Sequence, residues 1–134
     1  LKKQETEKAV LVGLITPNES EELLFEHLDE LKFLAETAGA ITKKRFLQNL
    51  RMANNRTYVG SGKIEEIKGY IDTHNINIAI FDDDLTGKQV SILEEYLEIK
   101  IIDRSTLILD IFASRAQTAQ AKTQLVIFLS KHYI

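Results

Sequence analysis

The 134-residue sequence contains no cysteine, no tryptophan, one proline and six glycines. Without cysteine, disulfide bonds and thiolate metal sites are excluded, and with them the small secreted scaffolds that disulfides hold together. No run of about 18 apolar residues is present to span a bilayer, and residues 1–8 are polar rather than a signal peptide. The scarcity of proline and glycine argues against a disordered or fibrous chain. We therefore expect a soluble, folded protein of a reducing compartment, the cytoplasm.

Catalytic signatures are also missing. No G-x-S-x-G nucleophile motif occurs, and there is no cysteine to replace it. His27, His74 and His132 are too far apart for ligand spacing, so we expect no metal. Asp82-Asp83-Asp84 would suit Mg²⁺ in a receiver-like fold, but the further carboxylates such a site needs are absent, and a solvated turn that helps to start a helix is the favoured interpretation. We expect no catalytic residue and no cofactor in this chain.

The charge present is unevenly distributed, although the net charge is only −3. Residues 18–38 carry seven acids and one lysine, a local charge of −6, whereas residues 42–69 carry seven bases and two acids, a local charge of +5. The first stretch predicts an acidic helix face, and the second predicts a surface that can meet phosphate.

Strand and helix signals alternate along the chain. Short apolar or β-type runs predict strands at Ala9–Ile15, Ile41–Leu47, Ile78–Phe81 and Lys100–Ile102. Lysine and arginine within Ile41–Leu47 favour the edge of the sheet for that strand. Because each strand is followed by a helical pattern, we predict a four-stranded parallel sheet in the order 2-1-3-4 with helices on both faces, an α/β fold.

The helix boundaries are predicted from capping residues. Asn18 with Glu21 is expected to cap the first helix and Gly39 to end it. The second helix follows a polar loop at Gln48–Arg56 and ends near His74. Thr86 with Gln89 predicts a capping box for the third helix, and Asp103-Arg104-Ser105 predicts a turn into the fourth.

The final segment, from about Thr118, looks helical and strongly apolar. We interpret residues 1–116 as the α/β domain and 117–134 as the first part of a long, truncated helix. An apolar helix that simply stops would leave a surface for a missing helix or for a second copy of the chain.

Ligands of open parallel sheets bind beyond the carboxyl ends of the strands. The turn Gly60, Ser61, Gly62 and Lys63 lies there, and backbone N–H groups at a helix start favour anions. It is not a P-loop, because Thr57 stands where that motif needs glycine and Ile64 where it needs Ser or Thr. A turn that lets the helix start close to the sheet is the favoured interpretation, with phosphate binding as the alternative.

A basic set surrounds the loop at Gln48–Arg56, which also contains Asn49, Asn54 and Asn55, with Tyr58 just beyond it. Positive charge, amides and an aromatic ring suit RNA phosphates and exposed bases, and we treat the loop as mobile. The alternative, equally weighted, is a solvated edge strand guarded by lysine. The candidate RNA-binding residues are Lys43, Lys44, Arg45, Arg51, Arg56 and Lys63.

Three segments decide between such alternatives: Tyr58–Ile67, Phe81–Gln89 and, most specifically, Ile102–Ala116. Together they closely resemble the N-terminal domain of HflX-family GTPases, over nearly the whole chain from Ala9 onward. The sequence departs from that family at Ser61, where Lys is usual, at Gly87, where Pro is common, and at Gln120, where Glu is usual. Ser61 weakens a phosphate role for its turn.

The resemblance implies a GTP-binding translation factor that associates with the large ribosomal subunit and helps to split or rescue ribosomes under stress. It implies that this chain contributes rRNA contacts and regulation, whereas GTP and Mg²⁺ belong to a G domain that follows a helical hairpin and is absent here. The partners would then be rRNA and that G domain. Two other interpretations stay open: an adenine-nucleotide-binding or hydrolysing domain using the Gly60–Lys63 turn, and a dimerisation module.

Overall fold

The computed structural model describes residues 6–115 of the chain. Its elements are β1 (Glu7–Ile15), α1 (Glu21–Thr37), β2 (Ala40–Asn49), α2 (Ser61–His74), β3 (Ile78–Phe81), α3 (Gly87–Leu97), β4 (Lys100–Asp103) and α4 (Arg104–Arg115). The predicted continuation at 117–134 lies outside the described residues. The strict alternation of strand and helix confirms the predicted α/β class.

The sheet has four parallel strands in the order β2-β1-β3-β4, as predicted. β1 and β3 occupy the centre, where their residues are nearly all buried, so they read as continuous apolar runs. β2 forms one edge, and its pairing with β1 contains a register shift: Ala9 faces Thr42, but Val10 faces Lys44. Lys43 is the extra residue of this bulge, which interrupts the regular pattern of the edge strand.

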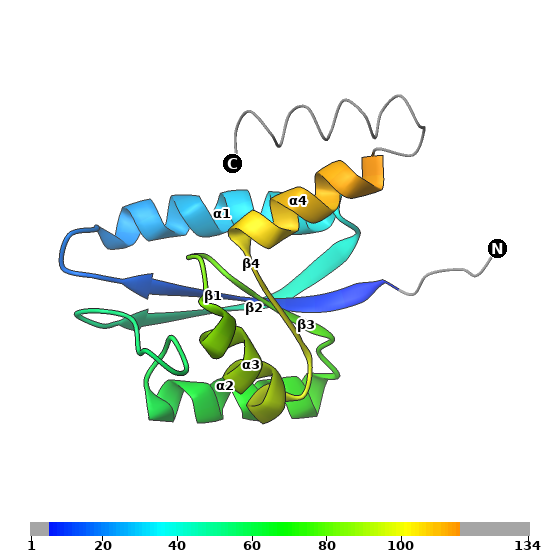
Figure 1. Ribbon diagram of the computed structural model, residues 1–134. Coiled ribbons are helices and arrows are strands. Elements are labelled where there is room, and N and C mark those ends of the chain that lie inside the picture. Colours follow the sequence, from blue (N-terminus) through cyan, green and yellow to red (C-terminus); the bar gives the residue numbers. More distant parts are fainter. Residues whose placement is uncertain (1–5, 116–134) are drawn as a thin grey trace.

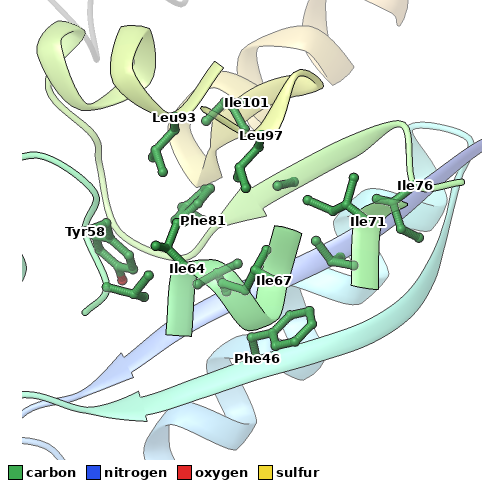
Figure 2. Packing of buried hydrophobic residues seen from close by; sticks show 14 of the residues in the cluster. Phe46, Tyr58, Ile64, Ile67, Ile71, Ile76, Phe81, Leu93, Leu97 and Ile101 are labelled. Carbon is green, nitrogen blue, oxygen red and sulfur yellow. The ribbon is translucent and has the colours of Figure 1, made fainter. Parts of the chain in front are cut away.

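Helices cover both faces of the sheet (Figure 1). α1 and α4 pack on one face, around Leu11, Leu28 and Ile80. α2 and α3 pack on the other, where Ile67, Phe81 and Leu93 belong to the larger cluster shown in Figure 2. Burial of the apolar stripes of these helices is the main stabilising term of such a fold.

Gly13, in the middle of β1, lets α1 approach the sheet closely. A Cβ atom at this position would lie 2.8 Å from Cδ1 of Leu24 and 3.4 Å from Cδ2 of Leu28. Both leucines are buried against the sheet, so a larger residue would push α1 outward.

Three predicted boundaries are wrong by a few residues. Ser20, not Asn18, caps α1, because its Oγ accepts the N–H of Leu23. β2 continues to Asn49, so the polar loop starts later than predicted. β4 passes directly into α4 at Arg104 without a turn, because Asp103 both ends the strand and accepts the N–H of Thr106 as a helix cap.

Other boundaries are confirmed, among them the end of α2 at His74 and both ends of β3. Thr86 and Gln89 form the predicted capping box of α3, with N···O distances of 3.0 Å and 2.9 Å. α1 ends at its predicted glycine, since Gly39 follows the C-cap residue Ala38 with a φ of +96°. Within residues 6–115, no helix is both long enough and apolar enough to cross a membrane.

Candidate nucleic-acid interface

The carboxyl ends of the strands gather three loops: residues 16–20 after β1, residues 50–60 after β2 and residues 82–86 after β3. β2 lies beside β1 on one side, and β3 lies beside it on the other side, so the strand order reverses direction at β1. The carboxyl end of β1 is therefore the topological switch point of the sheet. The residue 50–60 segment, here called the β2–α2 loop, is the longest of the three and carries two of the predicted RNA-binding residues, Arg51 and Arg56.

The acidic run after β3 is fully engaged within the protein. Asp82 accepts from Arg104 at 2.5 Å, and its other oxygen lies 3.7 Å from Nδ1 of His27. Asp83 accepts from the Tyr58 hydroxyl, and Asp84 accepts from Ser105 at 2.7 Å. Asp83 and Asp84 are exposed, as predicted for a solvated turn before α3, but the three carboxylates also tie this loop to α1, α4 and the β2–α2 loop.

Arg104 joins the acidic helix to this edge of the sheet. Its guanidinium donates to Glu30 at 2.7 Å and to the carbonyl of His27 at 2.7 Å, both on α1, as well as to Asp82. Asp103, which is almost fully buried, accepts the N–H of Leu85 at 2.9 Å and holds the β3–α3 loop. In the part of the chain that the structure describes, no cluster of three His, Asp or Glu side chains is placed to hold a metal.

The Gly60–Lys63 turn lies at the start of α2, with Gly60 as the cap residue. The N–H of Gly60 donates to Oε1 of Gln48 at 2.8 Å, and Nζ of Lys63 lies 3.2 Å from a carboxylate oxygen of Glu66. The Gly60 N–H group and the Lys63 ammonium group, which a bound phosphate would use, thus already have partners inside the domain. This arrangement is that of a structural turn joining β2 to α2.

The predicted basic set divides over both faces of the sheet. Arg45 points to the α1 face, where it lies 2.5 Å from Asp29. Lys44 points to the α2 face, where its ammonium lies 5.6 Å from the ring centroids of Phe46 and Tyr70. The six residues therefore do not form one patch.

Salt bridges divide the predicted basic set into paired and unpaired residues. Arg45 and Lys63 have carboxylate partners. Within residues 6–115, the salt bridges include none from Lys43, Lys44, Arg51 or Arg56. All four residues are exposed. These four cations are the ones whose charge is available to an external anion.

Tyr58 is the residue whose role the sequence did not reveal. The aromatic expected to meet RNA bases is only 1% exposed, so that expectation is wrong. Its ring packs edge-on against Phe81, with centroids 5.2 Å apart, and its hydroxyl donates to Asp83 at 2.5 Å. Burial, and then the Asp83 carboxylate, raise the pKa of Tyr58 far above its ordinary range.

The β2–α2 loop is held in place, contrary to its predicted mobility. Asn54 and Tyr58 pair as an antiparallel bridge through two backbone hydrogen bonds of 3.0 Å. The Asn54 side chain accepts the N–H groups of Arg56 and Thr57 inside the turn. Nε2 of Gln89 on α3 donates to the Asn54 carbonyl at 2.8 Å. The sequence contained one sign that the end of this loop is buried. Tyr58 is followed by the apolar Val59 shortly before a helix, and such apolar pairs often belong to the core.

The fold defines a small parallel α/β domain, and comparison with known proteins identifies its family. Residues 25–113 match the family described as GTP-binding GTPase N-terminal, and the chain belongs to this family.

The matching curated relatives are GTPases HflX. The chain is 49% identical over 118 residues to that of Flavobacterium psychrophilum, an alignment that covers 88% of this chain and 29% of the relative. It is 32% identical over 126 residues to the GTPase HflX of Escherichia coli, an alignment that covers 94% of this chain and 29% of the relative. The chain thus spans less than a third of the length of these relatives. The resemblance seen in the three sequence segments is confirmed.

Solved structures share the fold. A GTP-binding protein from the archaeon Sulfolobus solfataricus, crystallised with GDP, superposes with a TM-score of 0.64 at 22% identity, over 89% of this chain and 34% of that one. Neither Gly-Lys pair of the present sequence, Gly62-Lys63 or Gly87-Lys88, is followed by the Ser or Thr of a P-loop. The residues of this chain therefore match the N-terminal domain of the relatives and contain no P-loop.

Proposed function

We propose that this chain is the rRNA-binding and regulatory N-terminal domain of a cytoplasmic translation factor that associates with the large ribosomal subunit and helps to split or rescue ribosomes under stress. In this proposal, GTP and Mg²⁺ are bound by a G domain that lies outside these residues and is a partner of the domain. The family membership supports the GTPase context. The ribosomal role is inferred from the resemblance to HflX GTPases, and the exposed cations of the β2–α2 side support it because they can bind a polyanion.

The observation that carries the proposal is the set of four exposed cations, Lys43, Lys44, Arg51 and Arg56, that form no salt bridge within residues 6–115. A cation that already has a carboxylate partner must give it up to bind phosphate, whereas these can bind directly and release counterions from the RNA.

The acidic helix restricts the orientation of the domain on RNA. α1 carries Glu22, Glu26 and Glu30 on exposed positions, and like charges repel the phosphate backbone. Arg45 is neutralised by Asp29 at the border between the two surfaces. RNA would therefore approach the β2 edge and the β2–α2 loop while α1 stays turned away.

Charge reversal tests the proposal. In the full-length protein, Lys44→Glu combined with Arg51→Glu is expected to weaken co-sedimentation with purified large ribosomal subunits by roughly tenfold or more at moderate salt. The matched control is Lys100→Glu with Arg115→Glu, which changes the net charge equally at exposed positions that line a hollow with Glu7 and Ala40, at the starts of β1 and β2. Unchanged co-sedimentation of the first variant would show that these cations do not contact rRNA.

A further inference from the structure

The β2–α2 loop combines a fixed backbone with free side chains at its tip. Arg51, Met52, Asn55 and Arg56 are all exposed, and Met52 is 71% exposed. One exposed apolar side chain is normal on a protein surface. Met52 is of interest because it lines a hollow of this loop and lies next to Arg51, which is exposed and forms no salt bridge within residues 6–115.

The fixed backbone is maintained from three directions. Tyr58 is bonded to Asp83 and packs on Phe81, at the margin of the cluster in Figure 2. Gln89 reaches across from α3 to the Asn54 carbonyl, and Gln48 holds Gly60 at the other end of the loop. Tyr58 also has a φ of +66°, a conformation that a bulky residue adopts only when its surroundings enforce it.

A shallow hollow of about 360 Å³ lies in this loop, lined by Leu50, Met52, Ala53, Asn54, Asn55 and Gly60. Leu50 and Ala53 are half-buried and pack against the core, so they provide an apolar floor. Asn54 and Asn55 are the polar, exposed members of this lining, and the Oδ1 atom of Asn54 is already used inside the turn. Arg51 and Arg56 flank residues 52–55 of the lining in sequence.

We propose that this hollow binds one unstacked nucleobase of single-stranded rRNA. The floor and the Met52 thioether would cover the face of the base, the two asparagines would hydrogen-bond its edge, and Arg51 and Arg56 would bind the flanking phosphates. Tyr58, Asp83 and Gln89 are positioning residues that keep the hollow formed before RNA arrives, which removes the entropic penalty of ordering the loop on binding. This inference rests on the proposed rRNA-binding function.

The floor and rim are tested by Met52→Ala with Asn55→Ala in the full-length protein, using purified large ribosomal subunits as the ligand. The affinity is expected to fall by roughly tenfold, with an unchanged slope of log affinity against log salt, because no phosphate contact is lost. Chemical probing of the rRNA should show a base that the wild-type protein protects and the variant leaves reactive. Asn18→Ala, an exposed asparagine of the β1–α1 loop, is the control and should change neither readout.

The positioning role is tested by Tyr58→Phe, with Tyr96→Phe as the matched loss of a hydroxyl elsewhere. Tyr58→Phe should weaken binding and base protection at an unchanged salt slope while the thermal unfolding curve shows a folded protein. Arg51→Ala or Arg56→Ala should instead lower the slope by about one each. A purely structural hydroxyl would alter the unfolding curve but leave base protection intact, which would overturn the positioning role.

The outcomes separate the two proposals. If the wild-type protein does not bind large subunits, the proposed function fails. If it binds and responds to the arginine substitutions, but base protection and affinity are the same with and without Met52 and Asn55, only the nucleobase site is overturned. Contact of the loop with a ribosomal protein instead of rRNA, detected by cross-linking, would overturn the nucleobase site as well.

Discussion

Tyr58 combines features that rarely occur together: a ring that is almost fully buried, a hydroxyl bonded to a carboxylate and a φ of +66°. A left-handed conformation costs a bulky residue roughly 1–2 kcal/mol. The edge-on contact with Phe81 and the bond to Asp83 offset that strain. At this residue the core of the domain directly determines the shape of the β2–α2 loop.

Alkaline unfolding should report the environment of Tyr58. Its raised pKa means that the folded protein keeps the phenol proton above pH 10, whereas the unfolded chain loses it. The free energy of unfolding should therefore fall as pH rises above about 10, with this residue contributing up to roughly 1.4 kcal/mol per pH unit. Below that pH the phenol is neutral in both states and contributes no pH dependence.

The measurement is denaturant unfolding of wild type and Tyr58→Phe between pH 9 and 11. The variant should show a shallower decline, so the stability difference between the two proteins shrinks as pH rises. Tyr96→Phe is the control, since that tyrosine is 41% exposed and should leave the decline unchanged. If the free energy of unfolding fell equally with pH in wild type and Tyr58→Phe, the burial assigned to the Tyr58 hydroxyl would be contradicted.

At the scale of elements, the ends of helices decide how the chain turns back to the sheet. Gly39 follows α1 with a φ of +96°, and Asn75 and Glu98 end α2 and α3 in the left-handed conformation. Such C-terminal caps satisfy carbonyl groups that the helix leaves free. Each crossover from helix to strand is therefore compact, which suits a small parallel sheet.

Two glycine substitutions separate backbone conformation from helix propensity. Gly39→Ala should destabilise the domain by roughly 1–2 kcal/mol, because alanine is strained at a positive φ even though nothing lies within 4 Å of its added methyl group. Gly69→Ala, in the exposed middle of α2 with equally open space, should stabilise it by roughly 0.5–1 kcal/mol. Chemical denaturation of both variants measures the two effects, and shifts of the same sign would contradict this explanation.

Element order was predictable because the apolar strands and amphipathic helices repeat clearly. The strand Ile78–Phe81 and the capping box at Thr86 and Gln89 are confirmed to the residue. The cap of α1 was misplaced because Asn18 and Ser20 are both good N-cap residues, and only the backbone selects between them. Similarly, no local signal shows that Asp103 ends a strand and caps a helix at once.

The candidate site was less predictable than the fold, because it depends on contacts between distant residues. The sequence identifies the basic residues, but not that Arg45 and Lys63 are already paired. It indicates an aromatic in the loop, but not that Asp83, 25 residues away, buries and orients it. Long-range hydrogen bonds of this kind have no periodicity for a sequence pattern to reveal.

At the scale of the whole molecule, charge is segregated across the domain. The acidic α1 and the β2–α2 side carry local charges of opposite sign. Arg45 of β2 binds Asp29 of α1 at their border, whereas Arg104 joins α1 to Asp82 on the β4 side of the sheet. A domain with a net charge of −3 can still bind a polyanion through exposed cations that form no salt bridge within residues 6–115, such as Arg51 and Arg56 of the β2–α2 loop. The acidic α1 favours orientations in which that helix is turned away from the polyanion.

The central claim is that this domain contacts rRNA through its own cations, and salt-dependent sedimentation of the chain with purified large ribosomal subunits tests it most directly. The account predicts binding at low salt that weakens steeply at moderate salt, with a slope that corresponds to about three or four phosphate contacts. The same titration with the full-length protein should show an equal slope and a higher affinity if its additional contacts are non-ionic, and a steeper slope if they add phosphate contacts. Binding by the full-length protein alone, with no sedimentation of this chain even at low salt, would contradict the claim.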